Sequence, residues 1–459
     1  MNDVPALPWP SEGKRLMASQ FSGVAFTRRG FIGVAGGIAA AGLLAACAPS
    51  AGGSGGAASG DGEIKFWNMP WGNTEFNTLD EQITGDYVPA AGMGAASYQV
   101  IQWANFTQTF SAAVASNTGP AVSSGGGTQA FQFESQDKIA YADNLIESWK
   151  ANGLYDDFLP GLIDTMKVEK GYAAVPYNLD MRVMWYNKSL MEKAGAEPPT
   201  DWQSYIDAAA ALKKIDVYGY GTAAGAGSFT GSHVLTGWMV NNGGGLFDEE
   251  QKPNCVTPAN IEAMEFVLEM VEKGYVDPAS VTYTSANADS QWAAGTFGLG
   301  FDGGGLAANV AGDVGPQLVV GSPLTSPAGT KGSLYFPNNI MMYKNTPSQE
   351  ASEAFLTYYY QNMKSLWTEG TGIGLPPLKS ITETSEFQSN PNNVTIINEW
   401  QPIARTWAAP GGDALFLGVT AVDGTPAMET FTQSILGGRT DAKSALTALQ
   451  TAIEGSLAS

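Results

Sequence analysis

The alternation of strand-like and helix-like segments is the feature that most restricts how this chain folds. Residues 63–67 and 98–103 are predicted to form strands. A helical pattern follows the second of these segments and ends at residue 115. Val175 and residues 181–186 frame a third strand region. Short strands separated by helical segments predict an α/β fold, in which helices cover the faces of sheets.

Several expected helices have start and stop signals. Thr200, Thr257 and Thr346 stand where helix N-caps are expected. The first is expected to form a capping box with Gln203, and the other two directly precede a proline. Gly274 predicts the end of the helix that begins after Thr257. Apolar residues at helical spacing predict a final helix over roughly 442–454.

Composition and charge exclude several classes of function. Of the 459 residues, 44% are hydrophobic, which allows a large core. The formal net charge of −21 disfavours binding to nucleic acid and to anionic lipid, since both need clustered Lys and Arg. A single histidine, His233, excludes a histidine-based zinc site. We therefore expect no metal, no cofactor and no nucleic-acid partner.

The N-terminal region has the features of an export signal. Residues 27–33 read Thr-Arg-Arg-Gly-Phe-Ile-Gly, and an apolar stretch over residues 32–46 ends at Cys47. This region resembles a twin-arginine (Tat) signal joined to a bacterial lipobox. The alternative is an N-terminal membrane helix, but the stretch is shorter than the roughly 20 apolar residues that span a bilayer. Translation from Met17 rather than Met1 would give a more usual n-region.

The resemblance implies that residues 1–46 are a removed signal peptide and that Cys47 is lipidated. Two acyl chains give stable anchoring. Residues 47–62 are rich in Gly, Ser and Ala and are expected to form a flexible tether. These features predict a protein held only by its lipid on the extracytoplasmic face of a bacterial cell membrane.

One block in the middle of the chain resembles a known family. It contains Tyr-Asn-Lys at 186–188, Ala-Gly at 194–195 and Pro-Pro-Thr-Asp-Trp at 198–202. It is similar to the extracellular solute-binding protein family 1, the maltose-binding-protein-like sugar-binding lipoproteins of ABC transporters. Further blocks resemble that family in the same order: residues 241–247, 292–303, 338–359 and 437–454.

The resemblance implies a periplasmic-binding-protein-like fold of type II, with two α/β lobes joined by hinge crossovers. Ligand lies between such lobes, which close around it. The expected crossovers lie near residues 178–181, 333–338 and 380–386. The expected lobes are residues 63–178 plus 338–380 for lobe 1, and 179–337 plus 381–459 for lobe 2.

Candidate ligand-binding residues are those suited to a sugar, which has an apolar ring face and a rim of hydroxyls. Asp180 and Arg182 are two apart on an expected strand, so their side chains share a face. The family places a sugar-contacting carboxylate at this hinge, while an ion pair without ligand contact is the alternative. Tyr177 and Asn178 are neighbouring candidates.

Two loops of the first lobe supply further candidates. Trp71 and Asn73 follow the first strand, at the end where ligands of α/β sheets lie. Ser124 and Thr128 flank a glycine-rich loop that lacks the lysine of a phosphate-binding loop. This loop is either a close approach of backbone to a neutral ligand or a plain turn.

The second lobe adds His233, Trp238, Asp302 and Phe416. His233 is either a hydroxyl partner or a satisfied structural residue. Asp302 precedes glycines 303–305, where sugar-binding relatives often have a stacking tryptophan. The ring platform would then come from Trp71, Trp238 or Phe416.

These observations predict a non-enzymatic, monomeric protein that captures a neutral mono- or oligosaccharide and delivers it to an ABC-importer permease. Only three arginines lie after Cys47, at positions 182, 405 and 439, which argues against phosphate ligands. A polyamine or other non-sugar solute is one alternative, because acidic groups beside tryptophans also suit cations. An anchored glycoside hydrolase, with two carboxylates about 5–10 Å apart, is the other.

Overall fold

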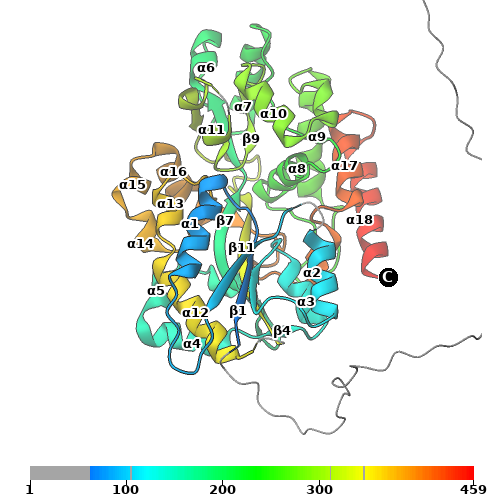
Figure 1. The fold of residues 1–459 in the computed structure, drawn as a ribbon. Helices are drawn as coiled ribbons and strands as arrows, with labels where there is room; N and C mark the ends of the chain where they lie inside the picture. Colours follow the sequence, from blue (N-terminus) through cyan, green and yellow to red (C-terminus); the bar gives the residue numbers. More distant parts are fainter. Residues whose placement is uncertain (1–61, 104–105, 311, 345–346, 459) are drawn as a thin grey trace, which may run out of the picture. The chain divides into compact units, whose positions relative to one another are not determined.

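The computed structural model describes residues 62–103, 106–310, 312–344 and 347–458. These residues belong to one compact unit, Ala57–Ser459. Figure 1 shows two groups of helices, each packed against its own sheet, with strands β7 and β11 passing between them. The chain therefore has the two-lobe α/β architecture that the sequence predicts.

The larger sheet has seven strands. Their order is β12-β11-β3-β1-β2, and β4 and β7 also pair with β11. The strands are β1 Ile64–Asn68, β2 Ala96–Val100, β3 Val122–Ser124, β4 Ile139–Ala140, β7 Val175–Met181, β11 Ser333–Tyr343 and β12 Ala404–Arg405. β1 pairs in parallel with β2 and β3, so the loops that follow these strands emerge at one edge of the sheet.

The second sheet has three antiparallel strands in the order β10-β8-β9. They are β8 Val183–Asn187, β9 Leu299–Asp302 and β10 Leu318–Val320. A separate two-stranded ladder joins β5 Lys167–Val168 to β6 Gly171–Tyr172. β8 follows β7 after one residue, Arg182, so the chain passes directly from the larger sheet to the smaller one.

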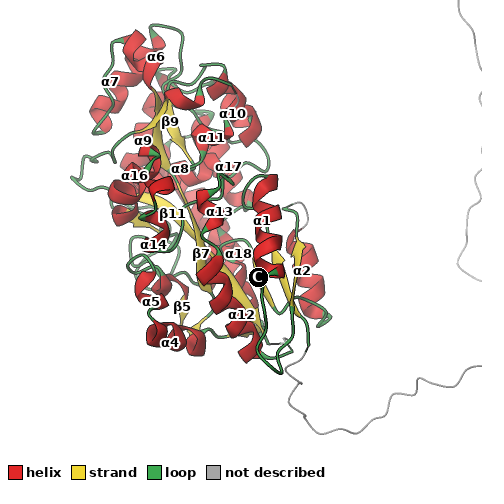
Figure 2. Cartoon of the chain, turned by 60° about the vertical axis from the view of Figure 1, so that its left-hand side comes forward, coloured by secondary structure: helices red, strands yellow, loops and turns green. Residues whose placement is uncertain are grey.

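Strand β11 is buried along its whole length and joins the parts of the larger sheet. Its end pairs with β3 and β4, its middle with β7 and its start with β12. The β7–β11 register shifts between Asn338 and Asn339, which is the mark of a bulge. Figure 2 shows these two strands among the helices near the middle of the molecule.

Helices cover the two sheets. Those beside the larger sheet are α1 Thr74–Gly85, α2 Phe106–Ala115, α3 Gln129–Ser135, α4 Asp143–Asn152, α5 Leu154–Asp157 and α12 Gln349–Asn362. Those in the part of the chain that contains the smaller sheet are α6 Lys188–Ala194, α7 Trp202–Lys213, α8 Thr230–Asn241, α9 Pro258–Glu272, α10 Ser285–Ala293 and α11 Leu306–Asn309. The later helices are α13 Ser365–Thr368, α14 Lys379–Thr382, α15 Ser385–Gln388, α16 Pro391–Thr395, α17 Pro426–Leu436 and α18 Ala442–Leu457.

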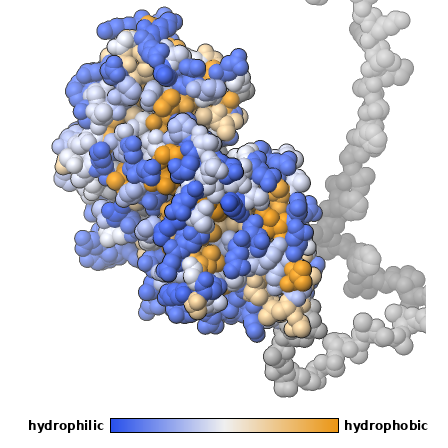
Figure 3. Space-filling model, turned by 90° about the vertical axis from the view of Figure 1, so that its left-hand side faces the viewer, coloured by the Kyte–Doolittle hydropathy of each residue, from blue (hydrophilic) through white to orange (hydrophobic). Residues whose placement is uncertain are grey.

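The surface beside α1 and α13–α16 is mostly hydrophilic. Figure 3 shows this side of the molecule, where hydrophobic residues form separate small patches rather than one continuous area. Large apolar side chains are instead packed inside, with Trp149, Trp185, Trp292 and Trp400 almost completely buried. This distribution is the normal one for a chain whose stability depends on its core.

The predicted strands and most helix signals are confirmed. Thr257 caps α9 by accepting from Asn260 N, and Gly274 follows the end of that helix with a left-handed φ of 66°. Ala445, Leu446 and their helical neighbours are buried on α18, which extends three residues beyond the predicted end at 454.

Two cap predictions are wrong by one or two residues. The cap of α7 is Asp201, whose carboxylate accepts from Ser204 N in a capping box, rather than Thr200 with Gln203. A carboxylate is the stronger acceptor at that position. The cap of α12 is Ser348, two residues after the predicted Thr346, which lies outside the described residues.

The predicted signal peptide and Cys47 lie outside the described residues, as does the tether apart from residue 62. Among the residues that are described, no helix combines the length and apolar character that a bilayer crossing requires. Cys255 is a free, buried thiol.

Candidate ligand-binding cleft

A cleft of about 780 Å³ lies where loops from the two sheets meet. Its lining brings together residues that are far apart in sequence, from Trp71 to Gly424. The volume is within the usual range for small-molecule sites, about 300–1,000 Å³. Loops after β1, β2 and β3 form one part of the lining, and residues around β8, β9 and α8 form another.

Aromatic side chains line the first part of the cleft. The rings of Trp71 and Trp103 meet edge to face at 4.9 Å, and Phe106 packs on Trp103 at 5.5 Å. Trp103 keeps 42% of its surface exposed, so its ring remains open to a ligand. Trp367 also lines the cleft, and its Nε1 donates to Gly374 O at 2.6 Å. These rings offer the flat apolar surfaces on which another ring can stack.

Four polar side chains that line the cleft form one line of hydrogen bonds. Arg182 Nη1 donates to Asp180 Oδ1 at 2.6 Å, and Arg182 Nη2 meets His233 Nδ1 at 2.8 Å. His233 Nε2 lies 2.9 Å from Asp423 Oδ1. Because the guanidinium has only protons to donate, Nδ1 must accept and Nε2 must donate to Asp423. His233 is therefore neutral, with its proton on Nε2.

The surroundings favour that neutral histidine. Burial lowers the pKa of His233, and the charge of Arg182 lowers it further, while Asp423 opposes both effects. At Asp180, burial raises the pKa, but the charge and hydrogen bond of Arg182 outweigh it, so that the pKa falls below its ordinary value. The line thus holds two carboxylates around one guanidinium and presents no free cation to the cleft.

Asp302 is the third carboxylate at the cleft. Burial raises its pKa to about 6, although the charge of Arg182 partly offsets that effect. Its Oδ1 accepts from Gly303 N at 2.7 Å. A Cβ on Gly303 would lie 3.4 Å from Asp180 Oδ1, so this loop runs directly beside the Asp180–Arg182 pair. Trp185 Nε1 holds the same loop by donating to Gly303 O at 2.9 Å.

Two asparagines that line the cleft lie side by side. Asn178 and Asn338 are partners in the β7–β11 ladder, and Asn338 Nδ2 donates to Asn178 Oδ1 at 3.0 Å. Asn178 Nδ2 has no partner among the described residues although Asn178 is only 1% exposed. A buried amide without a partner is unfavourable, so this group is suited to donate to a ligand or to water.

Seven of the predicted residues line the cleft: Trp71, Thr128, Asn178, Asp180, Arg182, His233 and Asp302. Five do not: Asn73, Ser124, Tyr177, Trp238 and Phe416. The structure therefore brings the hinge carboxylate, the histidine and the first tryptophan together. It also shows the Asp180–Arg182 ion pair, which the sequence left as an alternative to ligand contact.

The five other residues have local partners elsewhere. Asn73 caps α1 by accepting from Phe76 N, and Ser124 lies behind Trp71. Tyr177 is buried against Tyr359. Phe416 packs edge to face on Phe247 at 4.9 Å. For these positions the structure provides a packing or capping role rather than a place in the cleft wall.

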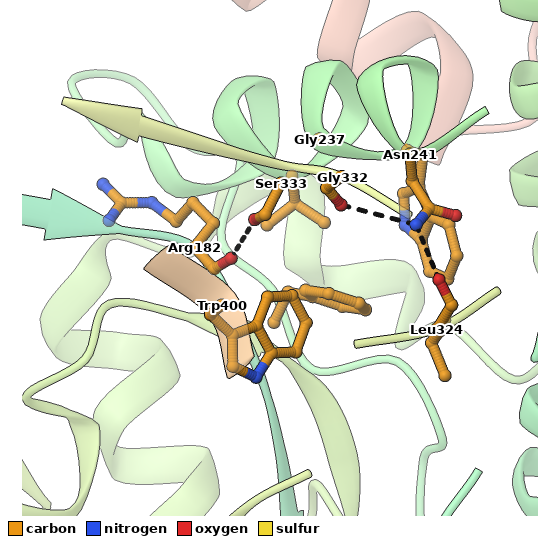
Figure 4. Close-up of a pocket in the computed structure, with 10 residues that line it drawn as sticks. Arg182, Gly237, Asn241, Leu324, Gly332, Ser333 and Trp400 are labelled. Atoms are coloured by element: carbon orange, nitrogen blue, oxygen red, sulfur yellow. Dashed lines mark hydrogen bonds between the residues drawn. The ribbon is translucent and has the colours of Figure 1, made fainter. Parts of the chain in front are cut away.

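Trp238 lies instead at a second, much smaller cavity of about 10 Å³, which shares Arg182 with the cleft. Figure 4 shows this cavity, where the Asn241 amide donates to Leu324 O at 2.8 Å and Ser333 Oγ donates to the carbonyl of Arg182. Trp238 Nε1 donates to Tyr220 OH at 3.2 Å. Such a space is about the size of one water molecule and cannot hold a sugar.

Sequence reasoning missed several cleft residues: Trp103, Trp185, Phe229, Phe336, Asn338, Trp367 and Asp423. Trp103 ends the predicted second strand, so the rule that placed Trp71 after the first strand would have found it. Asp423 and Trp367 have no such signal, because only the tertiary fold brings their segments to the cleft. Among the described residues there is no cluster of three metal-ligating side chains.

Residues 95–363 match the protein family described as bacterial extracellular solute-binding protein. A crystal structure of a sugar transporter from Arthrobacter chlorophenolicus A6 with bound laminaribiose is 50% identical to this chain. It superposes with a TM-score of 0.79 over 86% of this chain and 99% of that one. This chain belongs to the bacterial extracellular solute-binding proteins.

Two further matches place this solute-binding protein among more distant relatives. A putative binding protein of Brucella abortus is 22% identical over 299 residues, which cover 64% of this chain and 71% of that protein. The sugar-binding protein MalE of Xanthomonas citri is 18% identical, with a TM-score of 0.71 over 86% and 98% of the two chains, and shares the fold. The family and these neighbours are binding proteins rather than enzymes.

Proposed function

We propose that this solute-binding protein captures a neutral carbohydrate in its cleft and delivers it, chemically unchanged, to the permease of an ABC importer. The observation that carries the proposal is that one cleft combines the partly buried ring of Trp71 and the exposed ring of Trp103 with the carboxylates of Asp180, Asp302 and Asp423. Rings stack on the apolar face of a sugar, and carboxylates and amides accept or donate to its hydroxyls.

The charge arrangement supports a neutral ligand. Arg182 is the arginine that lines the cleft, and its guanidinium is engaged with Asp180 and His233. The charge of this guanidinium is already balanced by Asp180, and two more carboxylates, Asp302 and Asp423, line the cleft, so an anionic ligand would meet net negative charge there. The bound laminaribiose of the 50% identical structure makes that neutral disaccharide the first ligand to test here.

Isothermal titration calorimetry on the purified full-length chain tests this proposal. The panel is laminaribiose, maltose, ribitol, glucose 6-phosphate and spermidine at pH 7. We expect a neutral sugar to bind and the phosphorylated sugar not to bind. Trp71→Ala should weaken binding, whereas Trp292→Phe, which changes a buried indole outside the cleft, should not. Heat from none of the neutral sugars would refute the proposal.

A polyamine is the second candidate, because three carboxylates and several tryptophans line the cleft. Spermidine in the same panel separates the two: tight spermidine binding without sugar binding would favour the cation. Hydrolysis is tested by incubating the protein with chromogenic glycosides. We expect no turnover, and turnover lost on Asp302→Asn would favour the hydrolase.

The proposal also covers the location and the mode of action. Cys47 would be lipidated after export, so that the protein, as a monomer, stays outside the cytoplasm beside its permease. The lobes would comprise residues 63–178 plus 338–380 and 179–337 plus 381–459. Cys47→Ser tests the anchor, because the variant should lose incorporation of labelled palmitate and leave the membrane fraction. A variant that stays lipidated would place the anchor elsewhere.

A further inference from the structure

A chain of buried hydrogen bonds runs from the cleft indole of Trp71 into the core behind it. Trp71 Nε1 donates to Ser124 Oγ at 3.0 Å and to Asn68 Oδ1 at 3.2 Å. Asn68 Nδ2 donates in turn to Asp80 Oδ2 at 2.5 Å. Asn68 and Asp80 are completely shielded from solvent and do not line the cleft. A ring that faces ligand space is thus connected to a carboxylate that does not.

Asp80 determines which group is the donor in each of these hydrogen bonds. Its ionised carboxylate only accepts, from Asn68 at one oxygen and from the Tyr359 hydroxyl at the other, at 2.5 Å. Since Tyr359 gives its single proton to Asp80, the hydroxyl of Tyr177 donates to Tyr359 at 2.8 Å. Tyr177 then accepts the second amide proton of Asn68 at 3.2 Å. Both amide protons of Asn68 are therefore used on the core side.

Because the Asn68 NH₂ group donates to Asp80 and Tyr177, the amide oxygen must point toward Trp71. That oxygen also accepts from Met69 N at 2.9 Å and from the Ser124 hydroxyl. If the amide turned over, its NH₂ group would face the N–H groups of Trp71 and Met69, and donors would oppose donors. The indole would then lose an acceptor, so the orientation of its ring depends on the acceptor at Asp80.

We propose that Asp80 is a positioning residue for ligand binding, which acts through Asn68 to hold the Trp71 ring at the angle that a sugar face requires. This inference rests on the proposed function, because it takes the Trp71 ring as part of the ligand surface. A buried carboxylate whose hydrogen-bond partners are neutral is costly to the fold. Such groups are more typical of functional sites than of ordinary cores.

The surroundings of Asp80 make the arrangement sensitive to acid. Tyr98 of β2, Tyr177 of β7 and Tyr359 of α12 face this carboxylate, and Glu81 is the neighbouring charge. Burial raises the pKa of Asp80 to about 6, although hydrogen bonds to its carboxylate lower it. Between pH 7 and pH 5 the group passes from mostly ionised to mostly protonated, and a protonated carboxyl no longer accepts freely at both oxygens.

The first test measures laminaribiose affinity of the full-length chain by calorimetry at pH 7 and pH 5. Asp80→Asn should weaken binding about tenfold at pH 7, the fold-change that corresponds to one lost hydrogen bond. Glu81→Gln, which removes the same charge from an exposed neighbour on α1, should leave binding unchanged. Because His233 and Asp302 also titrate, the informative quantity is the difference between wild type and Asp80→Asn, which should shrink at pH 5.

A double-mutant cycle separates positioning from a merely structural role. In a Trp71→Ala background, Asp80→Asn should have no further effect on affinity, because no ring remains to be positioned. An equal loss in both backgrounds would overturn the inference. So would an Asp80→Asn protein that binds laminaribiose as tightly as the wild type while Trp71→Ala binds more weakly.

A readout without ligand keeps this inference distinct from the proposed function. In protein labelled with 5-fluorotryptophan, the ¹⁹F signal of Trp71 is assigned by its loss in Trp71→Phe. This signal should move between pH 7 and pH 5 in the wild type and remain fixed in Asp80→Asn. If no sugar binds the wild type, the proposed function fails, and this signal alone decides the inference. A Trp71 signal insensitive to both the pH and the Asp80→Asn substitution would refute it.

Discussion

His233 provides the sharpest prediction, because one neutral imidazole satisfies two charged partners. Replacing His233 with leucine removes the acceptor of Arg182 Nη2 and the donor to Asp423 Oδ1. Replacing it with glutamine supplies one acceptor and one donor in a neutral group. Leucine and glutamine have similar bulk, so the two variants differ mainly in the hydrogen bonds to Arg182 and Asp423. Only the glutamine variant can keep them.

The magnitude follows from the burial of the two partners. Arg182 is only 8% exposed, so its unpaired N–H costs roughly 1–3 kcal/mol. The side chain of Asp423 is a quarter exposed and can bond to water instead, so it adds little. We expect His233→Leu to lose about 2 kcal/mol of unfolding free energy at pH 7.5, and His233→Gln to lose less than half of that.

The pH dependence has a definite sign. The pKa of folded His233 lies below its ordinary value, so below pH 6.5 the unfolded chain binds more protons there. The stability due to His233 is thus present above pH 6.5 and is lost as the pH falls toward the lowered pKa. The buried Asp80 and Asp302 have raised pKa values and the opposite sign, but they are present in every variant and cancel in the comparison.

Equilibrium unfolding in urea at pH 7.5 and pH 5.5 measures these differences. The stability gap between wild type and His233→Gln should shift against the wild type at pH 5.5, because only the wild type has the imidazole. A leucine variant as stable as the wild type at pH 7.5 would show that the line of hydrogen bonds is not formed. An identical acid response in wild type and glutamine variant would refute the pKa argument.

Three further predictions concern single sites. Asp302→Asn should raise the unfolding free energy at pH 7 by about 1–2 kcal/mol, because ionisation of that carboxyl is opposed by burial, and the gain should vanish below pH 4. Gly374→Ala should weaken sugar binding in calorimetry, since its Cβ would lie 2.5 Å from Leu179 O, whereas Gly412→Ala, in open space, should not. Thr257→Ala should cost about 1 kcal/mol of stability in urea unfolding through loss of a helix cap and leave affinity unchanged.

The fold was predictable because its signals are local. The strand patterns near residues 64 and 98 and the cap at Thr257 act over a few neighbouring residues, and the structure keeps them. The capping error at α7 arose because Thr200 and Asp201 are both good caps, and only the geometry of the turn selects between them. Asp180 became a candidate through the resemblance to the family rather than through hydrophobic periodicity.

The cleft was predictable only in part, because its walls depend on long-range packing. Asp180 and Trp71 follow strand ends, where α/β sheets place ligands, and both line the cleft. Trp238 was a candidate because an indole can stack on a sugar ring. In the structure, however, helix α8 places its side chain against Tyr205 and Phe266 in the core. No short-range pattern tells a tryptophan that stacks inside a lobe from one that faces the space between lobes.

The pairing of strand β11 has a consequence for how the protein unfolds. One buried strand of eleven residues supplies ladder partners to β3 and β4 at one end and to β12 at the other, with β7 between. Neither end of the larger sheet can therefore unfold without removing a ladder partner from the other end. We expect calorimetric denaturation to show the larger sheet unfolding in one cooperative transition rather than strand by strand.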